Sequence, residues 1–251
     1  MKFNEFYSLT IVHSRDIILV KGVDYMNITK QKSQKTFDKQ AADYDTNIQG
    51  EHARKLYKPI IENLKNKNIH SILDLGCGTG ALLKEIKELN IAEQLFGIDI
   101  SPNMLEIAEN KLGNDATLIL GDSERLPFED SSFDAIVCND SFHHYPQPDI
   151  VEKEVSRCLK QNGVFIIGDC WQPIGARQIM NYYMKHSNSG DVKIYSKKEM
   201  LLLLSKDFHE IEWKSFGTSE YSNAIVHDFQ KFRAPFSGKI VHIFPEQSAV
   251  I

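Results

Sequence analysis

The sequence has few cysteines, and they do not form a metal-binding or disulfide-rich pattern. The four cysteines of the 251-residue chain lie far apart and include no C-x-x-C pair: Cys77, Cys138, Cys158 and Cys170. This spacing disfavours a zinc ribbon and a dense disulfide framework. We therefore expect a protein of a reducing compartment, the cytoplasm.

A long apolar run and an excess of positive charge are also missing. The most apolar N-terminal stretch, residues 9–20, contains His13, Arg15 and Asp16. It is neither the run of about 18 apolar residues that a membrane span needs nor a signal peptide. The 29 Lys and Arg residues against 34 Asp and Glu residues give a net charge of −5. No overall positive field therefore attracts nucleic acid or an anionic membrane, and only a local basic patch stays open.

The composition is that of a compact globular protein, with 42% hydrophobic and 25% charged residues. The length suits one large domain, or one domain with an appendage. We expect an appendage over residues 1–25, a main domain over 26–232 and a tail without periodicity over 233–251. The appendage is either an extra strand near residues 17–20 or upstream sequence before a working start at Met26, and the second origin is favoured.

In the main domain, helical periodicity comes first and alternating strands and helices follow. Apolar residues at three- and four-residue steps predict two helices within residues 33–66. Short β-rich segments then alternate with helical ones, which implies β-α-β crossovers and a parallel sheet covered on both faces. The predicted strands are 70–75, 94–98, 117–120, 133–138 and 164–167, and the predicted helices are 81–89, 102–111 and 149–159.

The alternation ends after the fifth predicted strand. We expect helices at 175–185 and 196–204, then two strands at 208–216 and 221–229. The short segment between these strands suits an antiparallel hairpin. The complete prediction is a doubly wound, Rossmann-like α/β sheet of seven strands, the last antiparallel, preceded by an N-terminal helical lid.

A glycine-rich turn between a predicted strand and a predicted helix is the most informative segment. Residues 71–80 have the sequence SILDLGCGTG, with Asp74 just before the turn. Its three glycines let the backbone turn tightly and approach a ligand closely, and the following helix directs free N–H groups into the same crevice. The spacing G-x-G-x-G differs from the G-x-G-x-x-G of nicotinamide-binding turns. A dinucleotide site is therefore the weaker alternative.

Residues 74–80, DLGCGTG, resemble motif I of the class I S-adenosylmethionine-dependent methyltransferases. The resemblance implies S-adenosylmethionine as the cofactor. It also implies cofactor contacts from Asp74, Gly76, Cys77, Gly78 and Gly80. Cysteine is common at this place in the motif, and no base accompanies it, so we reject a nucleophilic role for the thiol.

The next predicted strand ends in a segment that is similar to a second motif of this family. In FGIDIS, residues 96–101, Asp99 follows the glycine turn by about 20 residues, where a carboxylate accepts both ribose hydroxyls. A helix N-cap is the weaker alternative for Asp99, because Ser101 already fills that role. The resemblance adds Ile100 and Met104 to the implied cofactor contacts.

Two later strand ends also resemble motifs of the family. In GDSERLPF, residues 121–128, the resemblance implies that Asp122 accepts the adenine amino group, with Ser123 beside it; a solvated loop is the alternative. The segment after the fourth strand resembles motif IV, which lines both the methionine part of the cofactor and the acceptor pocket. Asn139 and Ser141 are therefore assigned to cofactor contact or its rim.

Residues 37–45, FDKQAADYD, are similar to a lid segment of small-molecule methyltransferases related to the ubiquinone and menaquinone C-methyltransferases. In those enzymes the helix folds over the cofactor, which implies that Tyr44 closes on its methionine end. A plain amphipathic helix is the alternative, and it explains Phe37 and Ala41 better.

Methyl transfer from a sulfonium is an in-line displacement, so positioning and exclusion of water are the main requirements. A general base is needed only where the acceptor loses a proton. His143 and His144 follow the fourth strand, and imidazole titrates near neutrality. We assign His144 as the catalytic residue; a packed or solvent-facing histidine is the alternative for each of the pair.

The sequence therefore predicts S-adenosylmethionine-dependent methyl transfer to a small-molecule acceptor, by a monomer or homodimer without a metal ion. Two alternatives stay open. A nicotinamide-dependent reductase is disfavoured by the glycine spacing and by the absence of a Tyr-x-x-x-Lys pair. The second alternative is a non-catalytic S-adenosylmethionine-binding protein, which the sequence does not exclude because this chemistry needs so few side chains.

Overall fold

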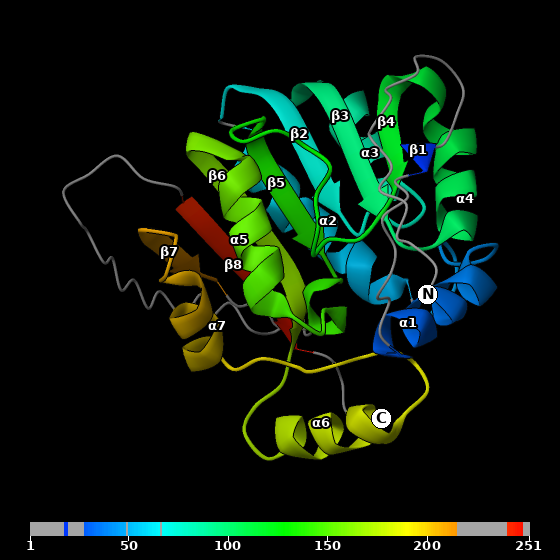
Figure 1. Cartoon of the computed structure of the whole chain (residues 1–251), viewed down its shortest axis with the longest axis vertical. Helices are drawn as coiled ribbons and strands as arrows, with labels where there is room; N and C mark the ends of the chain where they lie inside the picture. The colour runs from blue at the N-terminus through cyan, green and yellow to red at the C-terminus, as the bar shows by residue number, and fades with distance from the viewer. Residues whose placement is uncertain (1–17, 20–27, 49, 66, 215–239, 248–251) are drawn as a thin grey trace, which may run out of the picture.

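The structure is a computed structural model that describes residues 18–19, 28–48, 50–65, 67–214 and 240–247. Its centre is one sheet with the strand order β1-β4-β3-β2-β5-β6-β8-β7 (Figure 1). The strands are β1 (Ile18–Leu19), β2 (Ile69–Leu75), β3 (Ala92–Asp99), β4 (Ala116–Leu120), β5 (Phe133–Asn139), β6 (Leu159–Trp171), β7 (Glu210–Trp213) and β8 (Ile240–Gln247). The helices are α1 (Ile28–Gln40), α2 (Glu51–Leu64), α3 (Ala81–Glu88), α4 (Pro102–Leu112), α5 (Pro148–Cys158), α6 (Ala176–His186) and α7 (Lys197–Leu204), with 3-10 turns η1 (Gly113–Asp115) and η2 (Phe142–His144).

The sheet is Rossmann-like, and β2–β7 lie at the first six predicted strands. The two-residue β1 is an addition, which pairs in parallel with the end of β4 at the edge of the sheet. Its residues lie within the segment expected as an appendage. None of the described helices is long and apolar enough to cross a membrane.

Helices cover both faces because successive strand residues point to opposite sides of the sheet. Ile72 of β2 belongs to a buried cluster with residues of α2, α3 and α4. The next residue, Leu73, belongs to a second cluster with residues of α5 and α7. Figure 1 shows α5 and α7 on the near side of the sheet, with α2 and α3 behind it. The central strands are therefore buried on both faces, as their apolar runs predict.

The position of the site follows from the strand order. β2 and β5 are neighbours, although β3 and β4 come between them in the sequence. The chain moves outward from β2 to one edge and then returns to the other side of β2. At such a reversal a crevice opens beyond the carboxyl ends of the two strands. The glycine turn follows β2, and η2 follows β5, so both border this crevice.

The predicted antiparallel last strand is wrong. β8 pairs in parallel with both β6 and β7, and every other strand pair in the described sheet is parallel too. A short hairpin returns a strand antiparallel, whereas parallel neighbours need a crossover of about a dozen residues or more. Residues 214–239 supply that length between β7 and β8. The other predicted hairpin strand, 221–229, lies outside the described residues.

β8 is a strand that the sequence did not predict, because it falls in the expected tail. It lies between β6 and β7, and the side chains of Val241 and Ile243 are buried. Pro245 weakens the strand pattern, since proline is rare inside a sheet. Residues 161–163 form an irregularity inside β6, where Asn162 has a φ of 64°.

Candidate active site

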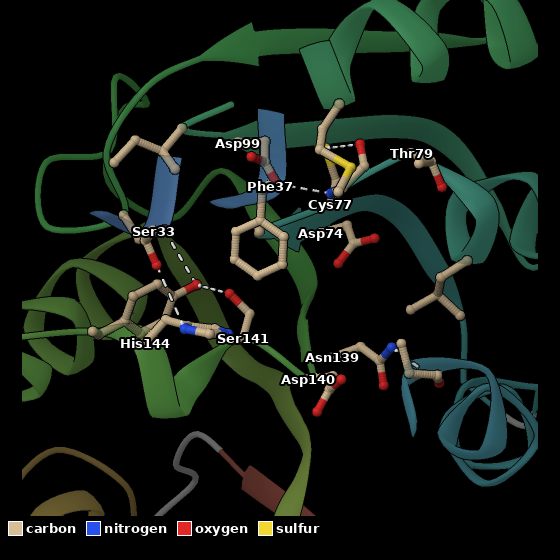
Figure 2. A pocket seen from close by; sticks show the side chains of 18 of the residues that line it. Ser33, Phe37, Asp74, Cys77, Thr79, Asp99, Asn139, Asp140, Ser141 and His144 are labelled. Atoms are coloured by element: carbon tan, nitrogen blue, oxygen red, sulfur yellow. Dashed lines mark hydrogen bonds between the residues drawn. The ribbon is translucent and has the colours of Figure 1, made fainter. Parts of the chain in front are cut away.

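A cavity lies at the carboxyl ends of the central strands, with Lys30, Ser33 and Phe37 of α1 in its lining; Figure 2 shows part of that lining. The cavity encloses about 890 Å³, including its open mouth. Twelve of the thirteen predicted cofactor residues line it, together with the predicted catalytic residue: Tyr44, Asp74, Gly76, Cys77, Gly78, Asp99, Ile100, Met104, Asp122, Ser123, Asn139, Ser141 and His144. The structure thus brings together residues from five segments of the sequence: 44, 74–78, 99–104, 122–123 and 139–144.

The glycine turn lines the cavity, and glycine is required at its positions for different structural reasons. Gly76 has a φ of +77°, and a Cβ there would lie 2.2 Å from Ser141 Oγ. Gly78 has a φ of +51°, and a Cβ there would meet nothing within 4 Å. The open space above Gly78 is therefore available to a ligand that approaches the backbone.

Gly80 is the predicted contact that the structure places outside the cavity lining. It is the N-cap of α3 with a φ of 72°. A Cβ at this position would lie 2.8 Å from Leu112 and 3.1 Å from Ala108 of α4. Its small size therefore lets α4 pack closely, a requirement that the motif alone did not separate from ligand binding.

Asp99 is held in place at the end of β3 by two backbone N–H groups. Gly78 donates to Oδ2 at 2.8 Å, and Ser101 donates to Oδ1 at 2.8 Å. Burial raises the pKa of Asp99 to about 6, although these hydrogen bonds oppose the shift. A carboxylate oxygen accepts more than one hydrogen bond, so the group can also accept two ligand hydroxyls side by side.

Two buried oxygens at the cavity have no hydrogen-bond partner among the described residues: Asp74 Oδ1 and Asn139 Oδ1. Burial, and then the charge of Asp99, raise the pKa of Asp74 to about 8. The amide nitrogen of Asn139 is occupied, because it donates to Ala53 O at 3.2 Å. A buried acceptor without a donor is costly. These two oxygens therefore suit a ligand that brings positive or hydrogen-bonding groups.

Asp122 forms an ion pair with a lysine of α1, the first helix of the lid. Lys30 of α1 is only 6% exposed, and its Nζ lies 2.6 Å from Asp122 Oδ2. The same ammonium group also pairs with Glu124. Glu124 in turn donates its backbone N–H to Asp122 Oδ1 at 3.0 Å. No motif links Lys30 to Asp122, so this contact could not be predicted from the sequence.

The segment that follows Phe37 contacts the rest of the domain at two further points, each through an aspartate. Asp38 accepts a hydrogen bond from Ser101 Oγ at 2.6 Å. Asp45 accepts from Thr79 Oγ1 at 2.5 Å and pairs with Lys111 at 2.7 Å. These carboxylates are the two Asp residues of the F-D-x-x-A-x-x-Y-D pattern, so the pattern itself could have identified them.

Tyr145 is a cavity residue that the motif comparison overlooked. Its hydroxyl lies 2.8 Å from Ser141 Oγ and 3.2 Å from Leu75 O. Ser123 donates to the same hydroxyl at 3.3 Å. The phenol therefore joins the ends of β2, β4 and β5 into one polar wall.

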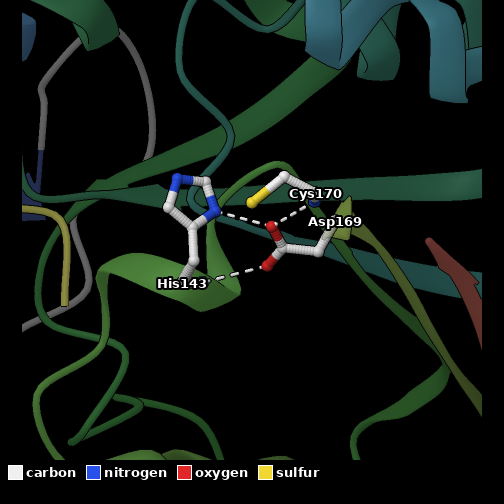
Figure 3. Close-up of side chains that lie close together, drawn as sticks. All are labelled: His143, Asp169 and Cys170. Carbon is white, nitrogen blue, oxygen red and sulfur yellow. Dashed lines mark hydrogen bonds and ion pairs between the residues drawn. The ribbon is translucent and has the colours of Figure 1, made fainter. Parts of the chain in front are cut away.

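The adjacent histidines after β5 have different nearest carboxylates. His143 Nδ1 lies 2.6 Å from Asp169 Oδ1, and its backbone N–H donates to Asp169 Oδ2 at 2.9 Å (Figure 3). His144 Nδ1 lies 3.1 Å from Asp191 Oδ1. Figure 2 shows His144 at the cavity near Ser33 of the lid, whose hydroxyl is 3.5 Å from Nδ1.

These surroundings give the two imidazole rings different charge states. Burial lowers the pKa of His143, but the Asp169 carboxylate outweighs it and raises that pKa well above its usual value. Burial and the neighbouring His143 lower the pKa of His144 to about 4. At neutral pH His143 is therefore charged, and His144 is a neutral imidazole that can accept a proton.

Side chains of this cluster also lie within the reach of a shared metal ion. One group is His143, Asp169 and Cys170, and the other is His143, His144 and Asp191. The two rings are stacked with centroids 4.0 Å apart and planes at 41°, and Asp169 already occupies Nδ1 of His143. The hydrogen-bonded pairs account for the cluster without an ion. Neither Asp169 nor Asp191 was predicted, because both come from segments distant in sequence.

Comparisons with known proteins agree with this geometry. Residues 73–167 match the family described as the methyltransferase domain. A demethylmenaquinone methyltransferase of Thermotoga maritima is 33% identical over 163 residues, which cover 62% of this chain and 71% of the relative. A demethylmenaquinone methyltransferase of Staphylococcus haemolyticus is 27% identical and covers 78% of this chain and 81% of the relative.

Solved structures share the fold. A SAM-dependent methyltransferase from Thermotoga maritima superposes with a TM-score of 0.55 at 21% identity, covering 69% of this chain and 79% of that one. Phosphoethanolamine N-methyltransferase 2 of Haemonchus contortus, in complex with S-adenosyl-L-methionine, gives a TM-score of 0.52 at 19% identity, covering 61% and 36%. The chain therefore belongs to the class I S-adenosylmethionine-dependent methyltransferases, and it is an enzyme that transfers the methyl group of this cofactor to a small-molecule acceptor.

Proposed function

We propose that the described cavity binds S-adenosylmethionine with its adenosine along the ends of β3 and β4 and its methionine end at β2 and β5. The observation that carries this assignment is the pair of buried, unpartnered oxygens of Asp74 and Asn139 beside the open space over Gly78. The cofactor has a cationic ammonium group and a sulfonium that suit these oxygens. When bound, it supplies the electrophilic methyl carbon.

The adenosine end has a matching set of acceptors. The fixed carboxylate of Asp99 would accept the two ribose hydroxyls, with Ile100 and Met104 beside it on the cavity wall. Asp122, with Ser123 next to it, would accept the adenine amino group while Lys30 keeps its charge balanced. Gly76, Cys77 and Gly78 would lie against the cofactor through the backbone.

On the acceptor side, His144 would act as the general base. It lines the cavity and is neutral at physiological pH. The Asp191 contact at Nδ1 would hold the ring with Nε2 as the proton acceptor. The lid residues Phe37 and Tyr44 would cover the methionine end and exclude water, since the ring of Phe37 lies 5.0 Å from that of His144.

The acceptor class that we propose is a hydroxylated aromatic ring of the quinone type. The relatives named above are demethylmenaquinone methyltransferases. The cavity lining supports a planar apolar acceptor, because it includes the aromatic rings of Phe37, Tyr44, Tyr57 and Tyr145. Methylation of such a ring removes a proton, which agrees with a base at His144.

Calorimetric binding of S-adenosylmethionine to Asp99→Ala tests the cofactor assignment. We expect binding to weaken by about 1.5–3 kcal/mol, the range for hydrogen bonds to a charged group. Asp115→Ala, at a surface carboxylate paired with Lys87, is the matched control. Unchanged affinity in Asp99→Ala would remove Asp99 from the cofactor site.

The domain and its setting complete the proposal. We propose one catalytic domain that starts near residue 26 and extends beyond 232, since β8 pairs with β6 and β7. All four cysteines are free thiols, which suits the reducing cytoplasm. A monomer or a homodimer stays the predicted assembly.

A further inference from the structure

α6 differs from the other described α-helices of more than eight residues because none of its residues is buried. Its side chains Ile179, Tyr182 and Tyr183 are 60%, 66% and 68% exposed. Spacings of three and four residues place them on one side of the helix. Ile174, just before the helix, is 78% exposed. A contiguous apolar face of this kind marks a surface that contacts something else.

The segment around this face carries only positive charge. Residues 171–190 contain no Asp or Glu, but they contain Arg177 and Lys185. Lys32 of α1 joins them, because its Nζ donates to Ser187 O at 3.1 Å. In a chain with a net charge of −5, this is a local basic patch beside apolar side chains. Its charge complements an anionic surface.

The segments before and after α6 also contact residues at the cavity. It follows β6, whose Asp169 holds His143. The chain after the helix returns to the same place, where the N–H groups of Val192 and Lys193 donate to His143 O at 2.9 and 3.1 Å. Gly190 approaches the lid so closely that a Cβ there would lie 2.3 Å from Ser33 N. Figure 1 shows α6 beyond the body of the sheet, at the end of the molecule that also holds α1.

We propose that α6 lies in the surface of an anionic lipid bilayer and brings the cavity to an acceptor dissolved in that bilayer. Short helices with an apolar face and a basic flank bind in the interfacial plane without spanning the membrane. Tyrosine suits this position, since its ring is apolar and its hydroxyl reaches water. The acceptor part of this inference rests on the proposed function, which assigns a lipophilic ring. The lipid contact itself rests on α6 alone.

Vesicle flotation of the full chain tests the contact. The vesicles would be phosphatidylcholine alone, or equal parts of phosphatidylcholine and phosphatidylglycerol. We expect binding to the anionic vesicles that falls at high salt, and a loss of about tenfold or more in the triple variant Ile179→Ser, Tyr182→Ser, Tyr183→Ser. Leu202→Ser on α7 is the matched control, because Leu202 is a similarly exposed apolar residue, at 69%, on another helix.

Three results would overturn the proposal. They are absence of wild-type binding to both vesicles, equal binding by the triple variant, and a wild-type dimer in light scattering that the triple variant converts to a monomer. The last result would assign the α6 face to a second copy of the chain. Calorimetry with S-adenosylmethionine separates this question from the proposed function. Intact cofactor binding without vesicle binding refutes only the lipid contact, whereas vesicle binding without cofactor binding refutes only the cavity assignment.

Discussion

At the scale of residues, the two adjacent histidines after β5 differ because the fold gives them different surroundings. Sequence analysis favours His144 as the base, but it does not distinguish the surroundings of the two rings. In the structure His143 pairs with Asp169, whereas His144 lines the cavity. Asp169 lies at the end of β6 and Asp191 follows α6, so only the tertiary fold brings these acids to the histidines.

We expect His144→Ala to lower turnover by about 100-fold or more while the affinity for S-adenosylmethionine stays nearly unchanged. A base acts on the acceptor and contributes little to cofactor binding. Steady-state kinetics and calorimetry on the same preparation measure the two effects. His70→Ala, at an exposed histidine paired with Glu93, is the control. Lost cofactor binding in His144→Ala would move the residue to the cofactor side.

Asp191→Asn tests the orientation of the base. The amide keeps the size of the side chain, but it lacks the charge that holds His144 Nδ1. We expect turnover to fall by about tenfold or more. A higher acceptor concentration should restore neither the rate nor the pH profile. An unchanged pH–rate profile would show that Asp191 does not position the ring.

Cofactor affinity should rise with pH between about 6 and 8. Burial raises the pKa of Asp99 to about 6 and that of Asp74 to about 8. Both acids are protonated in the free enzyme below these values, and protonation removes the charge that attracts the ammonium and sulfonium groups. Calorimetry across this range measures the rise, and Asp74→Asn should flatten its upper half. Affinity that falls as pH rises would contradict the assignment.

At the scale of elements, α1 is joined to the cavity by a buried ion pair. Lys30 and Glu124 are each 7% exposed in their side chains, and Asp122 is 32% exposed. Removing one member of a buried pair leaves an uncompensated charge, at a cost of about 3–5 kcal/mol. We therefore expect Lys30→Met to lower the free energy of unfolding by this order and to weaken cofactor binding.

Chemical denaturation and calorimetry measure both effects of Lys30→Met. Lys35→Met is the matched control, because Lys35 is an exposed lysine on the same helix. Equal stability of the two variants would show that the lid does not depend on this pair.

Glu152 of α5 is a buried acid that does not line the cavity, and it is 0% exposed. Burial, and then the neighbouring Asp207, raise its pKa to about 8. The folded chain therefore binds a proton that the unfolded chain releases above its usual pKa, so stability falls as pH rises from about 4.5 to 8. We expect Glu152→Gln to be more stable than the wild type at pH 8, by about 1–3 kcal/mol. Denaturation at acidic and alkaline pH measures this; a parallel loss in both proteins would contradict it.

At the scale of the whole molecule, local patterns predicted the central sheet well and its far edge poorly. Strands β2–β6 and helices α3–α5 have strong apolar periodicity and short connections, so their order and parallel pairing could be predicted. The direction of the last strand depends on which neighbours it meets after the long segment 214–239. No local signal carries that information. The cavity residues were predictable for the same reason as the central strands, since they lie where those strands end.

Contacts between distant segments were the part of the site that the sequence did not predict. Lys30 with Asp122, and Asp191 with His144, each join residues that no motif links. Their side chains are common surface types, and only burial at the cavity distinguishes them from solvated charges.

The most direct measurement is transfer of an isotopically labelled methyl group from S-adenosylmethionine to reduced demethylmenaquinone by the full chain. We expect labelled product with the wild type, a rate lower by about 100-fold or more with His144→Ala, and weak cofactor binding with Asp99→Ala. Substantial label transfer by a variant that carries both substitutions would contradict it, as would a wild type that binds the cofactor in the cavity and transfers no label to this ring.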